Sequence, residues 1–401
     1  MRILFIVPKI PYPPSDGHKK SIWGVIKYLS LLGHEIDIVA YRQNENLEAV
    51  RNEIEKYAKL FVLDVQTGNS IFGALKNIFS SVPYNLSKYN RRELKDFLPG
   101  YFQKNNVDII HVVNSHMGFV IDFIRRYSDA PVVLRQENLE MTIMKRYCQT
   151  QNNFLLKTYS FIQYKKFLKY EPALCEKFDK CIMMSREDDY ELRKLNPNVN
   201  TTVIPLGIEK DLLRMSSEQI EKYSLVHIGS LNWYPNLDGF DWFVQQIFPI
   251  VLKIIPEAKL YLYGSQLPEN YNLPKNLRDK IIVKGFVENI WEELRDKSLA
   301  VIPLRIGGGI RVKILEMLAA GKNIITTSLG KEGLELEDGR EILIADSPQK
   351  FAEKIINFFH DNYDSVKMAE AGRIFIENNY LWENIAARFQ DIYQNLLQSN
   401  K

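Results

Sequence analysis

Short apolar runs rich in β-branched and aromatic residues recur along the whole chain, and amphipathic stretches separate most of them. Several runs are continuously apolar, as expected for parallel strands that are covered by helices on both faces. In the first half the pattern predicts strands at Ile3–Pro8, Ile36–Ala40, Leu60–Leu63, Ile109–Val113, Val132–Leu134, Lys180–Met184 and Thr202–Ile204. In the second half it predicts strands at Leu225–Ile228, Lys259–Tyr263, Ile281–Val283, Leu299–Pro303, Asn323–Thr326 and Glu341–Ile344.

Helical periodicity fills most of the gaps, for example at Ser21–Leu32 and Asn236–Ile255. This alternation predicts an α/β protein with parallel sheets, built as two doubly wound Rossmann-like domains that face a central cleft. The turn-rich residues 205–208 favour a boundary there, giving domains at 1–205 and 206–380. Apolar residues at helical spacing in 382–397 predict that residues 381–401 form a helix packing back toward the N-terminal domain.

Composition narrows the class of protein. The 401 residues are 46% hydrophobic and 25% charged, and no run of about 18 apolar residues predicts a membrane-spanning helix. The apolar N-terminus is too short for the core of a signal peptide. Three cysteines (Cys148, Cys175 and Cys181) have neither metal-ligand spacing nor an even count. A reduced, cytoplasmic protein without a metal site or a nucleic-acid partner is the expectation.

The positive charge is concentrated in the first half. Residues 1–205 contain 29 Lys and Arg against 22 Asp and Glu, whereas residues 206–401 contain 23 against 27. The aromatic and basic segment 154–170 has no acidic residue and leaves two interpretations open. It is either a peripheral surface for the inner face of an anionic membrane or a core-packed helix with a basic outer face. The stretch 71–98 is likewise amphipathic and is expected to be a mobile excursion on the acceptor side.

The most informative stretch is 303–321, where an apolar strand runs into three glycines and then into a helix. A glycine turn permits close approach to the backbone, and the N-terminus of a helix presents N–H groups and partial positive charge. Two or three cations flank this turn. The pattern favours an anion, most plausibly a phosphate.

Further motifs occur in a fixed order between residues 228 and 334. They are Ile228-Gly229-Ser230, Trp233-Tyr234-Pro235-Asn236, Gly285-Phe286-Val287-Glu288, the turn and helix 307–316, and Gly330-Lys331-Glu332-Gly333-Leu334. This series resembles the donor half of GT-B glycosyltransferases, within them the retaining group known as group 1 or family 4. The first half resembles the family more loosely at residues 11–17, 33–35 and 203–208.

The resemblance implies a donor site for a nucleoside-diphosphate sugar in the second domain. Glu316 would bind the ribose hydroxyls, although a pair with Lys313 is the structural alternative. Lys313 and Arg311, with Arg305, would neutralise the leaving diphosphate, unless they are solvated surface cations. Backbone groups near Val287 would contact the base, or that segment is only a turn. The remaining donor-binding positions are Gly229, Gly308, Gly309, Ile310 and Val312.

One position departs from the family pattern. Relatives often have a second glutamate eight residues before the ribose-binding one, and here that position is Gly308. The identity of the donor sugar therefore does not transfer from relatives that retain the glutamate. A basic pair that relatives often place after the first strand of this domain is also absent, which favours Arg311 and Lys313 as its substitutes.

The resemblance also implies an acceptor side in the first domain. Asp16 and Gly17 would approach the reaction centre, and His18 could contact an anionic acceptor or simply begin a basic helix. Glu137 occupies the place where relatives often carry a histidine, so it would orient or deprotonate an acceptor hydroxyl, or form a structural salt bridge. His116 follows a strand end and could reach the same side, although a core or surface role is the alternative.

The resemblance thus implies a glycosyltransferase of hexosyltransferase type that acts with retention and needs no metal or cofactor. The donor would be a UDP or GDP sugar and the acceptor a glycan or a lipid-linked sugar, in cell-surface polysaccharide or glycoconjugate synthesis. A catalytically silent nucleotide-sugar-binding subunit of a glycosyltransferase complex is the alternative, which only the missing glutamate supports. A GT-B epimerase is less favoured, because the glycine run lacks acid/base groups.

Overall fold

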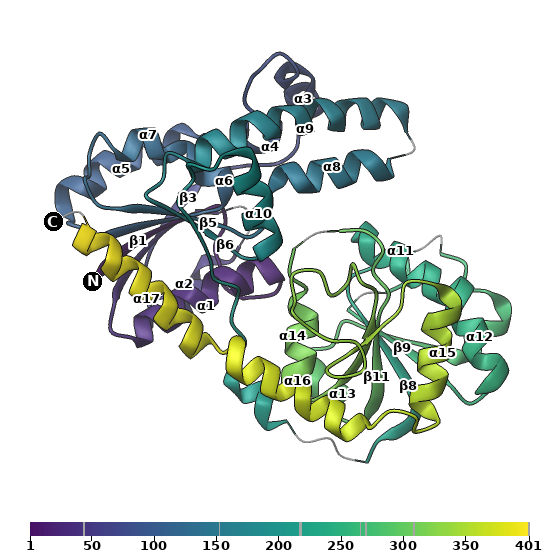
Figure 1. Cartoon of the computed structure of the whole chain (residues 1–401). Helices are drawn as coiled ribbons and strands as arrows, with labels where there is room; N and C mark the ends of the chain where they lie inside the picture. Colours follow the sequence, from purple (N-terminus) through teal and green to yellow (C-terminus); the bar gives the residue numbers. More distant parts are fainter. Residues whose placement is uncertain are drawn as a thin grey trace. The chain divides into compact units, whose positions relative to one another are not determined.

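The computed structural model describes residues 1–42, 45–151, 153–215, 219–264, 266–268, 271–307 and 309–399 (Figure 1). The chain divides into two compact units. Unit 1 comprises Met1–Gly207 and Trp382–Lys401, and unit 2 comprises Ile208–Leu381. Each unit contains one parallel sheet with helices on both faces, so the predicted α/β class of two doubly wound domains is confirmed.

The sheet of unit 1 has seven strands in the order β3-β2-β1-β4-β5-β6-β7. Their paired neighbours are parallel, and Ile3 of β1 pairs with Ile36 of β2 and with Ile109 of β4. The strand order reverses between β1 and β4, which makes this pair the topological switch point. The strands are β1 (Arg2–Val7), β2 (Glu35–Arg42), β3 (Lys59–Asp64), β4 (Ile109–Val113), β5 (Val132–Gln136), β6 (Lys180–Met183) and β7 (Thr201–Val203).

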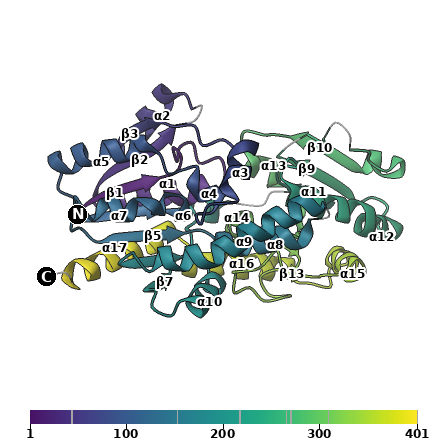
Figure 2. The ribbon, with the colours of Figure 1, turned by 90° about the horizontal axis from the view of Figure 1, so that it is seen from above.

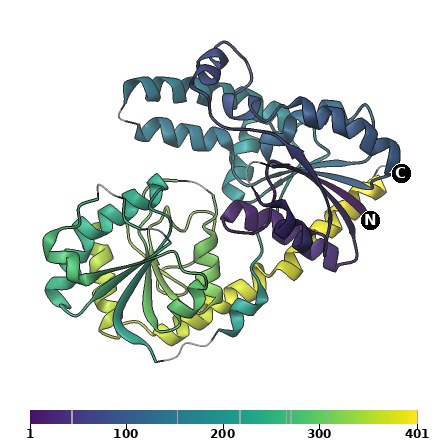
Figure 3. The same cartoon turned by 180° about the vertical axis from the view of Figure 1, so that it is seen from behind.

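Helices cover both faces of this sheet. Helices α1, α2 and α17 lie on one face, and α5, α7 and α9 pack on the other through Leu94, Ile121 and Phe167 (Figure 3). The helices of unit 1 are α1 (Gly17–Leu31), α2 (Leu47–Ile54), α3 (Ile71–Asn77), α4 (Tyr84–Ser87), α5 (Arg92–Lys104), α6 (Asn114–Met117), α7 (Ile121–Ile124), α8 (Glu140–Thr150), α9 (Phe154–Cys175), α10 (Arg186–Leu195) and α17 (Trp382–Ser399).

Helices α8 and α9 form a hairpin and run side by side (Figures 1 and 2). The middle and end of α9 bury Ser160, Gln163, Phe167 and Glu171 against the rest of unit 1. Its first turns are exposed, with Phe154 among the exposed side chains. The core-packed interpretation of residues 154–170 is therefore correct for the later turns of this segment only.

The sheet of unit 2 has six strands in the order β10-β9-β8-β11-β12-β13, again with parallel neighbours. Its switch point lies between β8 and β11, where Leu299 pairs with Leu225. The strands are β8 (Glu221–Ile228), β9 (Lys259–Tyr263), β10 (Ile281–Gly285), β11 (Lys297–Ile302), β12 (Asn323–Thr326) and β13 (Leu343–Ile344).

The predicted helix 236–255 is interrupted. Residues Phe243–Ile247 form a π-helical turn between α11 and α12, and Pro249 stands in the first turn of α12. Proline lacks an N–H donor and suits the start of a helix, so one continuous ladder of helical hydrogen bonds cannot pass through it. The helices of unit 2 are α11 (Tyr234–Trp242), α12 (Phe248–Ile254), α13 (Ile290–Leu294), α14 (Val312–Ala319), α15 (Pro348–Phe359) and α16 (Ser365–Asn379).

Helix α17 belongs to unit 1, although the chain reaches it directly from unit 2. Trp382 stacks on Tyr28 of α1, with ring centroids 6.0 Å apart. A Cβ atom on Gly24 or Gly207 would lie 2.0 or 2.3 Å from the Trp382 ring, so these two positions admit the indole only because they lack side chains. Further along α17, the Tyr393 hydroxyl hydrogen-bonds to His111 Nδ1 of β4 at 2.5 Å.

Candidate functional site

A glycine turn joins β11 to α14 at the carboxyl edge of the unit 2 sheet. Gly307 and Gly309 have φ angles of +125° and +75°, in the region that favours glycine. Gly308 lies outside the described residues. The N-cap residue Arg311 makes no side-chain capping hydrogen bond to the first N–H groups of α14. Such a turn presents backbone donors and partial positive charge to an anion.

Lys313 connects this turn to the neighbouring strand across the switch point. Its Nζ donates to the carbonyl oxygen of Ile228, at the end of β8, at 2.9 Å and to Asn236 Oδ1 at 3.1 Å. Burial, together with repulsion from Arg311, lowers the pKa of Lys313 to about 8. Both oxygen atoms are neutral, so these bonds hold the ammonium in place without compensating its charge.

Gly229 permits this arrangement. It follows β8 with φ of +149°, and a Cβ atom there would lie 2.7 Å from Asn236 Nδ2 and 3.2 Å from Lys313 Nζ. Any side chain at this position would displace the ammonium or the amide that holds it. Asn236 belongs to the motif Trp233-Tyr234-Pro235-Asn236, which the sequence alone does not connect with Lys313.

The other predicted donor residues have varied surroundings. Arg311 donates from Nη1 to the carbonyl oxygen of Gly309 at 2.6 Å, which folds its side chain back onto the turn. Arg305 forms a two-pronged ion pair with Asp238, with nitrogen–oxygen distances of 3.0 and 2.6 Å. A phosphate would have to compete with that carboxylate for Arg305. Glu316 is half-buried on α14, and the half-buried Ile310 and Val312 flank its first turn.

The segment predicted to read a base follows β10. Gly285 has φ of +70° and accepts a hydrogen bond from the Gly264 amide at 2.8 Å, which ties the ends of β10 and β9 together. Val287 packs beside Tyr263 in a small apolar cluster on the sheet. Phe286 is 83% exposed and projects from the turn between them. The segment is thus an anchored turn with one outward aromatic ring.

In unit 1, His18 and Glu137 form the pair at the carboxyl edge of the sheet. His18 Nδ1 is hydrogen-bonded to Glu137 Oε2, which joins the start of α1 to the loop after β5. Asn114, directly after β4, accepts a hydrogen bond from the Glu137 amide at 3.3 Å, and its Nδ2 lies 3.4 Å from His18 Nδ1. Asn114 has φ of +62°, a conformation that is uncommon for a residue with a side chain. These residues meet at the β1/β4 switch point.

Buried Arg135 supports the charge of this pair. Burial acts to raise the pKa of Glu137, but the charges and hydrogen bond of His18 and the charge of Arg135 outweigh it, and the pKa is lowered overall. The Arg135 guanidinium lies 4.9 Å from the Phe389 ring of α17 and makes no hydrogen bond within the described part of the chain. Burial lowers the pKa of Arg135 to about 10. An arginine inside a strand was the sequence signal, and sequence reasoning missed it.

The remaining acceptor-side residues have clear local roles. Asp16 caps α1 by accepting from the Lys19 amide at 2.8 Å, and Lys9 holds its other oxygen at 3.0 Å. Gly17 is the first residue of that helix. His116 Nε2 lies 3.7 Å from Glu140, and burial lowers the pKa of His116. Asp16 thus positions His18 through the helix start.

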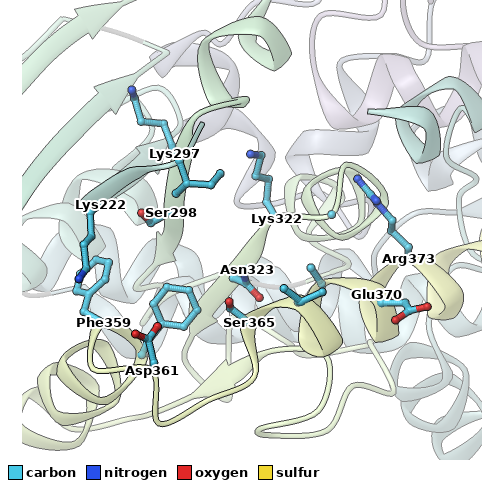
Figure 4. A pocket seen from close by; sticks show the side chains of 15 residues that line it. Lys222, Lys297, Ser298, Lys322, Asn323, Phe359, Asp361, Ser365, Glu370 and Arg373 are labelled. Carbon is cyan, nitrogen blue, oxygen red and sulfur yellow. The ribbon is translucent and has the colours of Figure 1, made fainter. Parts of the chain in front are cut away.

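A cavity of about 680 Å³ lies at the opposite, amino edge of the unit 2 sheet (Figure 4). Lys297, Lys322 and Arg373 lie along one side of it. Lys297 is bound by Glu221 and Asp296, and Arg373 donates to the carbonyl oxygen atoms of Met215 and Ala320. Lys322 donates to the carbonyl oxygen of Arg295 at 2.8 Å. All three cations are thus bonded within the fold, and none of the predicted donor residues lines the cavity.

Across the described ranges, no group of three or more His, Cys, Asp and Glu side chains is placed to hold a metal ion. In the same residues, no helix is both long and apolar enough to cross a membrane.

Comparison with known proteins agrees with this geometry. Residues 222–361 match the family model for glycosyl transferases group 1. An uncharacterized 44.6 kDa protein in the cps region of Klebsiella pneumoniae is 23% identical over 392 residues, covering 94% of this chain and 96% of that protein.

Two solved structures share the fold. Sucrose-phosphate synthase from Thermosynechococcus elongatus has a TM-score of 0.71 at 16% identity, with all of both chains covered. HepE from Anabaena, solved with UDP and glucose, has a TM-score of 0.65 at 14% identity, covering 98% of this chain and 99% of that one. At these identities the likeness shows the fold alone, and the family match lies in unit 2. Residues 222–361, within unit 2, thus match the glycosyl transferases group 1, and the whole chain shares the fold of the solved GT-B structures.

Proposed function

We propose that the protein transfers a sugar from a nucleoside-diphosphate sugar, held by unit 2, to an acceptor hydroxyl held by unit 1, with retention of configuration. The observation that carries the proposal is Lys313, whose ammonium stands at the β8/β11 switch point beside a glycine turn. Ligands of doubly wound sheets bind at the carboxyl ends of the strands at such points.

The donor would bind through four groups of contacts. Its diphosphate would lie against the N–H groups at the start of α14 and against Lys313. Glu316 would accept hydrogen bonds from the two ribose hydroxyls, and backbone groups near Val287 would contact the base. The ammonium of Lys313 loses no carboxylate partner when a phosphate arrives, because its present hydrogen-bond partners are neutral oxygen atoms.

The reaction then needs little covalent chemistry from the protein. The bond between the anomeric carbon and the phosphate oxygen breaks, and the acceptor oxygen attacks the same face of the sugar. The proton of the acceptor hydroxyl passes to the departing phosphate oxygen. Lys313 and Arg311 stabilise the negative charge that develops on the diphosphate, because both cations are already positioned before the reaction begins. We propose that these cations take the role without a metal or another cofactor.

His18 and Glu137 would serve the acceptor. The carboxylate of Glu137 can only accept, so Nδ1 of His18 carries the proton in their hydrogen bond, and Nε2 is the ring nitrogen that this bond leaves for the acceptor. We propose that His18 contacts the acceptor hydroxyl and that Glu137, which is 7% exposed, positions the ring. In this proposal Glu137 orients the acceptor hydroxyl through His18.

The choice of substrate rests on the relatives. HepE was solved with UDP and glucose. This favours a UDP sugar over a GDP sugar as donor and a hexosyl group as the transferred group. The Klebsiella pneumoniae relative lies in a cps region, which favours synthesis of a cell-surface polysaccharide or glycoconjugate. A glycan or lipid-linked sugar would then be the acceptor, reached from the cytoplasmic side of the membrane.

Thermal-shift measurement against a panel of nucleoside diphosphates and their sugars tests the donor site. UDP or UDP-sugars are expected to raise the melting temperature. Lys313→Ala should weaken UDP binding roughly 10- to 100-fold, as expected for the loss of a charge-assisted contact. The matched control is Lys253→Ala, which removes an exposed lysine of α12 and should leave binding unchanged. If no nucleotide stabilises the protein, the donor proposal is wrong.

A silent binding subunit would bind the nucleotide without chemistry. Hydrolysis of the donor, or its transfer to added acceptor, that disappears in Glu316→Ala and Lys313→Ala would exclude that alternative. Binding without turnover, in the presence of acceptor lipid extract, would favour it.

A further inference from the structure

Helix α3 carries its large apolar side chains on the outside of the protein. Ile71, Phe72, Leu75 and Phe79 are 81%, 86%, 55% and 94% exposed. Residues 71, 75 and 79 are spaced by four, with 72 beside 71, so they share one side of the helix and of the turn after it. No described residue covers them. Solvent-facing helix sides are normally polar, so this face is an exposed apolar patch of the kind that marks an interaction site.

The other side of α3 is fastened to unit 1. Asn77 donates from Nδ2 to the Val82 carbonyl oxygen at 2.9 Å and accepts from Gln163 Nε2 of α9 at 3.2 Å. Tyr84 holds the helix start, where its hydroxyl and the Ser70 amide lie 2.6 Å apart. These contacts set the orientation of α3, which lies on the side of α9 away from the sheet (Figures 1 and 3). The outward apolar face is therefore a fixed feature of the fold.

The surroundings of this face are basic. Residues 65–91 contain Lys76, Lys88 and Arg91 and no Asp or Glu, and residues 154–170 of the adjacent α9 contain four lysines and no acid. Arg92, next in the chain, is paired with Asp96. Two of these lysines bond to neutral oxygen atoms, Lys88 to Asn69 Oδ1 at 2.9 Å and Lys166 to Asn77 Oδ1 at 3.2 Å. Because these acceptors are uncharged, the hydrogen bonds do not neutralise the positive charges of Lys88 and Lys166.

We propose that this surface, which we call the α3 face (Ile71, Phe72, Leu75, Lys76 and Phe79), docks the protein on an anionic lipid bilayer. The apolar side chains enter the boundary between headgroups and acyl chains, and the surrounding cations contact the anionic headgroups. A helix of seven residues spans only about 10 Å, which suits shallow insertion. A second copy of the chain is a poorer occupant, because a twofold contact would bring the same cations together.

The proposal deepens the proposed function, since a lipid-linked acceptor would be met at the same surface. Its test uses the full chain and flotation with vesicles of phosphatidylcholine alone or of phosphatidylcholine mixed with phosphatidylglycerol. The protein should float with the mixed vesicles and far less with neutral ones. High salt should reduce the bound fraction.

Variants locate the contact. Phe72→Ser with Phe79→Ser should lower partitioning onto mixed vesicles by about tenfold or more, and Lys76→Glu should lower it less. The matched control is Tyr190→Ser, which removes a 64% exposed ring from the acid-rich α10 and should float like the unaltered protein. Unchanged melting temperatures and UDP binding would show that each variant is folded and keeps its donor site.

Several outcomes would overturn the proposal. They are absence of vesicle binding by the unaltered protein, equal binding to neutral vesicles in high salt, or equal binding by the double variant. A change in oligomeric state on Phe72→Ser with Phe79→Ser, without vesicle binding, would assign the face to self-association. Failure of UDP binding with vesicle binding intact would count against the proposed function and not against the membrane contact.

Discussion

At the scale of single residues, Lys313 is the group with the most chemical consequence. Its ammonium is held by two neutral oxygen atoms next to Arg311, and its pKa is lowered to about 8. A lowered lysine pKa means that the protein without ligand stabilises the ammonium less than water does. A bound diphosphate favours the ammonium instead. In the proposed donor site, binding of the nucleotide and protonation of Lys313 would therefore be coupled.

The affinity for UDP should accordingly be highest below the pKa and fall as the pH rises past about 8. Above that pH, each binding event must take up a proton at Lys313. Calorimetry in buffers of different ionisation enthalpy should detect this uptake. Lys313→Arg keeps its charge over this range, so its affinity should be nearly independent of pH. Affinity that is equally flat in the unaltered protein would contradict the coupling.

The His18–Glu137 pair gives a second residue-scale prediction. Glu137→Gln removes the charge that holds Nδ1 of His18, so the transfer rate should fall by at least about tenfold. The pH profile of the rate should move, while the dissociation constant for UDP should not. Asp122→Asn, which alters an exposed ion pair with Lys177, is the control and should change neither quantity. An unaltered rate in Glu137→Gln would leave the pair with a structural role.

The sequence predicted local parts of the site better than distant ones. The glycine turn and α14 are contiguous, so composition and order were enough to propose an anion site. The contact between Lys313 and Ile228 spans 85 positions, and that between His18 and Glu137 spans 119. These pairs form because the strand order reverses between their elements. The local sequence around each residue does not reveal this reversal.

At the scale of elements, every strand predicted from the apolar pattern is present, but several ends differ. β8 begins at Glu221, four residues before the predicted start at Leu225. Polar Glu221 can belong to a strand because Lys259, Tyr261 and Lys297 all bond to its carboxylate. β13 is shorter than predicted, since Glu341 instead accepts a hydrogen bond from the Glu337 amide at 2.9 Å. The hydrophobic pattern thus predicts the centres of the strands, whereas tertiary hydrogen bonds determine where the strands end.

Helix α17 gives a prediction for element packing. Trp382 is 3% exposed and fits against Gly24 and Gly207, so Trp382→Ala should destabilise unit 1 by about 3–5 kcal/mol. Chemical denaturation would measure the loss. Trp233→Ala removes an indole that is 65% exposed and should cost far less. Equal losses in the two variants would contradict the packing described for α17.

At the scale of the whole molecule, unit 2 begins and ends at one place. The Ile208 amide donates to the Tyr380 carbonyl oxygen at 2.6 Å, and Ile208 pairs with Leu381 in a parallel bridge. Unit 1 is thus discontinuous in sequence, whereas unit 2 is one uninterrupted segment, Ile208–Leu381, with adjoining ends. Domains with adjoining ends tolerate excision and insertion.

Residues 208–381 expressed alone should therefore fold and bind UDP with an affinity close to that of the full chain. Circular dichroism and calorimetry would check the two properties. Removing residues 382–401 from the full chain should damage unit 1 and leave unit 2 folded, since α17 packs against α1 and β4. An unfolded 208–381 fragment would show that unit 2 depends on unit 1.

The adjoining ends of unit 2 have a consequence for how new sugar specificities can arise. A segment whose two ends meet can be replaced by recombination, because unit 1 keeps the same two junctions whichever segment lies between them. Donor choice and acceptor choice would then be inherited separately. If unit 2 holds the donor as proposed, exchanging the segment between relatives should give chimeric proteins that place a different sugar on the same acceptor.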